Sequence, residues 1–304
     1  HHDIRYWEIW NEPENRPAMW TGDDQDYYRL YAAAAKAIKQ RFPNVMVGGP
    51  ALGYAGKLEG DALLPTEFVS GFFELCRRDE VPLDFFSWHT YTNNPSELAV
   101  RSRAVRRLLD ENGFAKTENH LNEWNYLPDG DWSPVLNEDV RMRQAWFDRV
   151  HGAEGAAFTA AALLLLQDTP LDVSNYYSAD THGFGMFTEH GVPFKNYYAL
   201  KAFNLLLETP ARLPVKVQWP ESNGTSGDTV NQNTGLVAAA GISDDEARIT
   251  LLVANFCAAA ETLECNFSGI PWQGETVCEV LRLDAQHDLD ATISGEATDG
   301  GRCT

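Results

Sequence analysis

The chain has 304 residues, of which 44% are hydrophobic, enough for one large folded domain and a smaller one. It carries 44 acidic residues against 24 basic ones, giving a formal net charge of −20. Nucleic acids and anionic membranes are bound through basic patches, so this balance argues against both as partners. The longest apolar run, residues 156–166, is too short to span a bilayer.

The five cysteines and the scattered histidines give no metal-binding pattern. No Cys-x-x-Cys pair and no His-x-x-x-His spacing is present, so we expect neither a metal site nor a dithiol redox site. Cys257, Cys265 and Cys278 fall in predicted strands, either as buried thiols or with two of them paired. Glycine-rich phosphate loops are also absent, and no cofactor is expected.

The first predicted strand ends in a carboxylate. Residues 4–10 are rich in aromatic and branched side chains, the composition of a buried strand. Asn11 and Glu12 follow, and Pro13 then ends the strand because it has no amide hydrogen to donate. Glu12 therefore lies where a strand gives way to a loop, which in a barrel of parallel strands is the catalytic rim.

Strands and helices then alternate along the chain. Apolar spacing predicts helices over 27–42, 67–78, 96–112, 138–167 (broken near Gly152 and Gly155) and 194–207, and strands over 45–49, 83–88, 120–124 and 173–177. Asp24 or Asp26 is predicted to cap the first helix, and residues 52–65 are predicted to form a loop. Such alternation predicts parallel strands covered by helices, in either an open doubly wound sheet or a closed (β/α)8 barrel.

The pattern changes at Thr209-Pro210, where helical periodicity disappears. Short strands are predicted over 236–240, 248–255, 262–267 and 277–283, and no pattern is visible from about residue 288. We therefore predict a catalytic domain over residues 1–208 and a small antiparallel β-sandwich over 209–304.

Glu12 and Glu123 each end a predicted strand. In a closed barrel these strand ends face one central cleft. Two carboxylates across a sugar-sized cleft are the usual apparatus for cleaving a glycosidic bond, one protonated to assist the leaving oxygen and one ionised to attack carbon. Asn11 is placed to bind the sugar hydroxyl beside the reacting carbon, and His89 and Tyr91 end another strand that points to the cleft.

The motif Trp10-Asn11-Glu12-Pro13 resembles the acid/base motif of the retaining glycosidase clan built on the (β/α)8 barrel. Together, residues 6–13 and 85–91 resemble glycoside hydrolase family 39, which includes β-xylosidases, α-L-iduronidases and exopolysaccharide hydrolases. Segments 174–180 and 193–199 resemble the family's eighth strand and final helix, so the resemblance covers about residues 3–208.

By position, the resemblance implies that Glu12 is the acid/base and Glu123 the nucleophile. The predicted substrate-binding residues are Asn11, His89, Tyr91, Trp124 and Tyr177. The sequence departs from the family where Asn122-Glu123-Trp124 replaces the more usual Thr-Glu-Phe, and where tyrosines replace the tryptophan platform of the eighth strand. These departures leave the substrate less defined than the mechanism.

Because the clan's acid/base follows its fourth strand, the resemblance implies strands four to eight of a TIM barrel, an open half-barrel. We therefore expect the sequence to be part of a longer enzyme, poorly stable and inactive alone. Glu8 is predicted to point into the barrel and hold an arginine. Trp20, Trp132 and Glu189 are candidate substrate contacts in loops.

The predicted activity is that of a retaining, β-xylosidase-like glycoside hydrolase acting on an oligo- or polysaccharide. One alternative is an endo-acting hydrolase of a cell-wall polysaccharide or exopolysaccharide. Another, from a different class, is a non-catalytic carbohydrate-binding protein, against which the presence of both Glu12 and Glu123 argues. The sequence favours no compartment and no oligomeric state.

Overall fold

The computed structural model describes residues 3–217, 235–257, 263–270, 272, 276–297 and 302–303. The chain divides into two compact units. The first unit comprises residues 1–91, 97–125 and 168–177, and the second comprises 92–96, 126–167 and 178–304.

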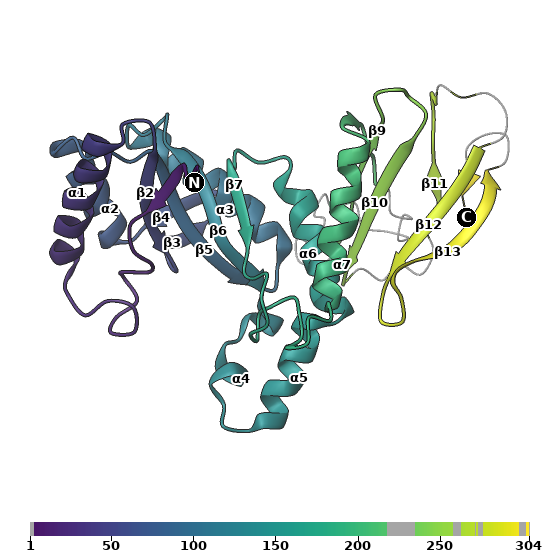
Figure 1. Ribbon diagram of the computed structural model, residues 1–304, viewed down its shortest axis with the longest axis horizontal. Coiled ribbons are helices and arrows are strands. Elements are labelled where there is room, and N and C mark those ends of the chain that lie inside the picture. Colours follow the sequence, from purple (N-terminus) through teal and green to yellow (C-terminus); the bar gives the residue numbers. More distant parts are fainter. Residues whose placement is uncertain are drawn as a thin grey trace. The chain divides into compact units, whose positions relative to one another are not determined.

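The first unit is built on a sheet whose described strands have the order β1-β2-β5-β6-β7 (Figure 1). These strands are β1 Tyr6–Glu8, β2 Met46–Leu52, β5 Phe85–Thr92, β6 Glu118–Tyr126 and β7 Val173–Tyr176. The pairs β1–β2, β2–β5 and β6–β7 are parallel. The intervening helices are α1 Asp24–Arg41, α2 Glu67–Arg78 and α3 Pro95–Glu111. The predicted alternation is thus confirmed, as an α/β fold whose five described strands form a curled half-barrel and no closed ring.

Aromatic side chains of α1 hold the first unit together. Tyr27 and Tyr31 are fully buried, and the Tyr31 ring packs edge-on against Phe72 of α2, with ring centroids 4.7 Å apart. Their hydroxyls donate to backbone carbonyls, Tyr27 to Ile9 at 3.0 Å and Tyr31 to Pro82 at 3.0 Å. Because Ile9 directly precedes the Trp10-Asn11-Glu12 segment, α1 fixes where the first strand ends.

Two local predictions in this unit are wrong. Asp23 caps α1, and Asp26 is its partner in a capping box, because Asp26 lies three residues further on and bonds back to the Asp23 amide. Residues 52–65 contain a hairpin of β3 Gly56–Glu59 and β4 Ala62–Pro65. Its tip holds Gly60 at a positive φ of 60°, a conformation that glycine adopts without strain.

In the second unit, the predicted helical break is confirmed at Gly152, between α5 Val140–His151 and α6 Ala153–Leu166. A Cβ at Gly152 would lie 2.7 Å from the Asp148 carbonyl oxygen, so the break needs glycine. The unit also holds η1 Pro128–Gly130, α4 Ser133–Leu136, α7 Lys195–Asn204 and η2 Leu205–Glu208. None of the helices described in either unit is long and apolar enough to cross a membrane.

The C-terminal part of the second unit contains antiparallel strands. They are β8 Ala211–Leu213, β9 Gly235–Ile242, β10 Ile249–Phe256, β11 Cys265–Asn266, β12 Thr276–Leu283, β13 Asp288–Ala297 and β14 Arg302–Cys303. The sheet order is β10-β9-β8, with separate pairs β12–β13 and β11–β14. Neither β8 nor β13 was predicted, and residue 262 of one predicted strand lies outside the described residues. Phe158 of α6 packs against Phe256 of β10, with ring centroids 5.5 Å apart. The domain boundary at 208/209 and the sandwich stay predictions.

Candidate active site

Glu12 lies in a turn just after β1 whose backbone is unusual. Trp10 and Glu12 have φ values of 71° and 47°, in the left-handed region that residues with a side chain rarely adopt. The Glu12 amide donates to the carbonyl of Ala51, a residue of β2, at 2.9 Å. Strained backbone of this kind persists only where surrounding contacts hold it, and it is common at functional sites.

Glu123 lies in a β-bulge of β6. Leu121 pairs with Ser174 of β7, and Trp124 pairs with Tyr176, so Asn122 and Glu123 together face a single residue. A bulge of this kind re-aims side chains that strict alternation would send to opposite faces. Asn122 reaches Glu8 and Glu123 reaches Tyr91, so both side chains lie on the same face of the sheet.

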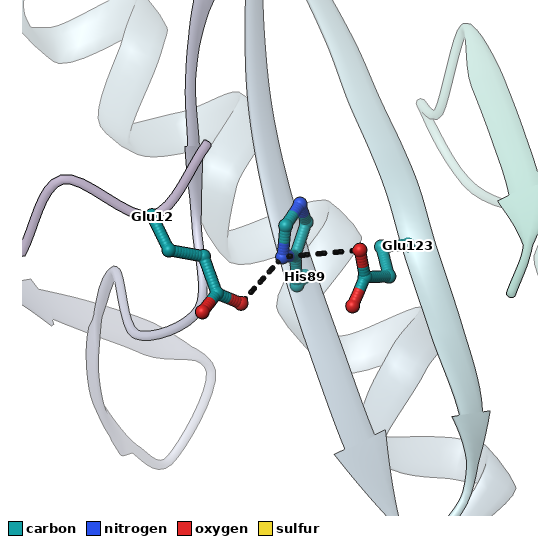
Figure 2. Close-up of side chains that lie close together, drawn as sticks. All are labelled: Glu12, His89 and Glu123. Atoms are coloured by element: carbon teal, nitrogen blue, oxygen red, sulfur yellow. Dashed lines mark hydrogen bonds and ion pairs between the residues drawn. The ribbon is translucent and has the colours of Figure 1, made fainter. Parts of the chain in front are cut away.

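His89 of β5 lies between the two carboxylates, as Figure 2 shows. Its Nδ1 atom is 2.8 Å from Oε1 of Glu12 and 3.8 Å from Oε2 of Glu123. One carboxylate oxygen of each glutamate and one nitrogen of His89 all lie within 4.8 Å of one another. These three groups could also hold a cation, but each already has a partner in a protein hydrogen bond or ion pair.

Two more side chains fix the orientations of the carboxylates. The Tyr91 hydroxyl donates to Oε1 of Glu123 at 2.6 Å, and the Asn15 amide donates to Oε2 of Glu12 at 3.0 Å. Tyr91 was predicted from its place at a strand end. Asn15 was not predicted, although its backbone N–H donates to the Glu12 carbonyl at 3.0 Å in a turn that the Glu-Pro sequence favours.

The electrostatics follow from these contacts. The hydrogen bond to His89 lowers the pKa of Glu12, and this effect outweighs the rise that partial burial causes; Asn15 acts in the same direction. Burial raises the pKa of Tyr91 far above its ordinary value, and the neighbouring Glu123 carboxylate raises it further. Tyr91 therefore stays protonated and serves as a hydrogen-bond donor.

The remaining predicted contacts differ in outcome. Asn11 is exposed beside Glu12, and Tyr177 is exposed just after β7. Trp124 is fully buried, donates to the Ser174 hydroxyl at 2.8 Å and packs edge-on against Tyr176. The prediction that the Trp124 ring contacts substrate is wrong, because the residue after the bulge turns away from the catalytic face.

Glu8 and the loop tryptophans also differ from expectation. Within the described residues, Glu8 accepts from Asn122 and not from an arginine. Trp20 packs edge-on against Trp10 and donates to the Asp23 carbonyl at 3.2 Å, so it braces the turn before α1. Trp132 and Glu189 belong to the second unit. Glu189 lines a separate pocket of about 640 Å³ there, which contains neither Glu12 nor Glu123.

Comparison with known proteins identifies relatives of the chain. The family model of glycosyl hydrolases family 39 matches residues 3–240. A β-xylosidase from Geobacillus stearothermophilus is 26% identical over 226 residues, and one from Caldicellulosiruptor saccharolyticus is 29% identical over 234 residues. Each match covers 67% of this chain but only 42% of the relative, so the chain spans less than half the length of these proteins.

Solved structures share the fold. A glucosidase from Croceicoccus marinus matches 98% of this chain and 65% of its own length, with a TM-score of 0.68 and 23% identity. A family 39 enzyme from Xanthomonas axonopodis pv. citri matches 82% of this chain and 46% of its own, with a TM-score of 0.57 and 21% identity. At these identities the likeness is one of architecture.

Proposed function

This chain belongs to glycosyl hydrolase family 39, and we propose that it supplies both catalytic carboxylates of a retaining β-glycosidase. The observation that carries the proposal is the pairing of Glu12, in the turn after β1, with Glu123 of β6, whose oxygens lie within 4.8 Å of each other. Carboxyl groups about 5–5.5 Å apart suit retention, whereas inversion needs about 6.5–9.5 Å to admit a water molecule between them.

In the first step, Glu123 attacks the anomeric carbon. The bond from that carbon to the leaving oxygen breaks, and Glu12 gives this oxygen its proton. Tyr91 already occupies Oε1 of Glu123, so Oε2 is the oxygen left to form the new bond. The product of this step is a glycosyl ester of Glu123 and a free alcohol.

In the second step, water attacks the same carbon and Glu12 takes the water's proton. The ester bond breaks, Glu123 leaves as a carboxylate, and the sugar keeps its original configuration. Asn11, beside Glu12, binds the hydroxyl next to the reacting carbon. Tyr177 forms part of the sugar-binding wall.

The proposed substrate is a β-xyloside. The support is that two relatives, 26% and 29% identical to this chain, are β-xylosidases. A β-glucoside is the natural comparison, because the Croceicoccus marinus structure is that of a glucosidase.

The test is the stereochemistry of hydrolysis by the protein in its full natural length. With 4-nitrophenyl β-xyloside, proton NMR taken within the first minutes should show β-xylose before mutarotation forms the α anomer. An initial α anomer would overturn retention. If calorimetry showed sugar binding but neither the xyloside nor the glucoside were hydrolysed, the proposed activity would be overturned in favour of a non-catalytic carbohydrate-binding protein.

A further inference from the structure

A third carboxylate, that of Glu8 at the end of β1, lies on the same face of the sheet as the catalytic pair and has no part in the two steps above. It is two residues before Trp10, and the residue is exposed. Asn122 of β6 donates to it, and hydrogen bonding by Ser87 of β5 lowers its pKa. Each of these side chains leads to one catalytic residue.

The first connection leads to Glu123. Asn122 Nδ2 donates to both oxygens of Glu8, at 2.8 and 2.9 Å. Asn122 is the other residue of the bulge that carries Glu123, so Glu8 holds the bulge from β1, across the two intervening strands β2 and β5. Loss of the Asn122–Glu8 hydrogen bonds would remove the side-chain link that sets the position of the bulge relative to β1.

The second connection leads to Glu12. The Ser87 hydroxyl, whose hydrogen bonding lowers the pKa of Glu8, accepts from the Ala51 amide at 2.9 Å. The Ala51 carbonyl in turn accepts from the Glu12 amide at 2.9 Å. Ala51 has a φ of 55° and lies in a second bulge, because Gly49 pairs with Phe86 and Leu52 pairs with Trp88.

We propose that Glu8 is a positioning residue whose carboxylate ties both bulges together and so sets the separation of Glu12 and Glu123. This inference rests on the proposed function. An ionised carboxylate suits the task because it only accepts hydrogen bonds and can serve two donors at once. A glutamine of the same shape would present an amide that donates, and one of the two partners would lose its acceptor.

Partial removal from water raises the pKa of Glu8, while the hydrogen bonds from Ser87 and Asn122 oppose that rise. Because the residue is exposed, the free-energy cost of keeping its charge is limited.

The experiment compares Glu8→Gln, Asn122→Ala and the double variant in the full-length protein, using an aryl β-xyloside. A small displacement of catalytic groups costs up to about 100-fold in rate. We expect each single variant to lower kcat by about 10- to 100-fold while KM changes by less than about 3-fold. We expect the double variant to be no slower than the slower single variant, because both changes break the same link. Glu74→Gln, an exposed carboxylate of α2, is the matched control and should keep wild-type kinetics.

Ser87→Ala tests the other arm separately. It should impair poor leaving groups, which need the proton from Glu12, more than activated aryl glycosides, a difference that a general loss of folding would not produce. Wild-type kcat in Glu8→Gln, or multiplied losses in the double variant, would overturn the inference while leaving the proposed function intact. A wild-type protein that hydrolyses neither xyloside nor glucoside would overturn both.

Discussion

The Tyr91 hydroxyl donates to Oε1 of Glu123 across 2.6 Å, from the strand next to the one that carries the glutamate. This bond makes the two oxygens of Glu123 different: Oε1 is held, and Oε2 is 3.8 Å from His89. A nucleophile held by one oxygen presents the other in a fixed direction, which is the geometry that attack on one carbon atom requires.

We therefore expect Tyr91→Phe to lower kcat. Hydrogen bonds to charged groups contribute about 1.5–3 kcal/mol, so the expected loss is about 10- to 100-fold. Steady-state rates on an aryl β-xyloside measure it. Tyr198→Phe, on α7 of the second unit, is the control and should have little effect. A Tyr91→Phe enzyme with wild-type kcat would show that the bond does not orient the nucleophile.

Glu12→Ala should separate the two steps. A 2,4-dinitrophenyl leaving group needs no proton, so formation of the glycosyl-enzyme should continue while its hydrolysis slows for lack of a base. Azide, which needs no base, should restore turnover and give a β-glycosyl azide detectable by mass spectrometry. Glu123→Ala should abolish hydrolysis of every substrate. Equal losses in the two variants on the activated substrate would contradict the assigned roles.

The contact between His89 and Glu12 leads to a prediction about how kcat/KM depends on pH. Its hydrogen bond lowers the pKa of Glu12, and a general acid loses activity as pH rises through its own pKa. Removing the bond in His89→Phe should raise that pKa, so the alkaline limb of the kcat/KM profile should move to higher pH even though the maximum rate falls. Asn15→Ala should move the limb in the same direction. A limb that stays in place or moves to lower pH would show that His89 does not set the ionisation of Glu12.

The elements of the first unit could be predicted because their signals are local. Helix α2 follows the predicted range, residues 67–78, because its apolar side chains recur at helical spacing and Thr66 caps it. Glu12, His89, Tyr91 and Glu123 also come together as expected, since each lies in the carboxyl-terminal half of a strand of one sheet or in the turn after it.

The two bulges could not be predicted, because each depends on the register of a neighbouring strand. Alternation with a period of two places Asn122 and Glu123 on opposite faces, and only the pairing of β6 with β7 shows that both share one face. The same extra residue turns the Trp124 side chain away from the face that carries Glu123 and into the core, which is why its predicted contact with substrate was wrong. The partner of Glu8 was likewise beyond local reasoning, since Asn122 is far away in the chain.

A last prediction concerns stability and Asn119, which lies fully buried in β6. Its Oδ1 accepts from Trp88 Nε1 at 2.8 Å, and its Nδ2 donates to the carbonyls of Ser102 at 2.9 Å and Pro170 at 3.2 Å. One side chain thus joins β5, α3 and the segment before β7.

Asn119→Ala would leave the indole of Trp88 and two carbonyls buried without these partners, and each such group costs about 1–3 kcal/mol. We expect the free energy of unfolding to fall by at least about 3 kcal/mol, measured by urea denaturation, while the exposed control Asn44→Ala changes it by less than about 0.5 kcal/mol. An equal, small effect in both variants would show that water replaces the lost hydrogen bonds at this position.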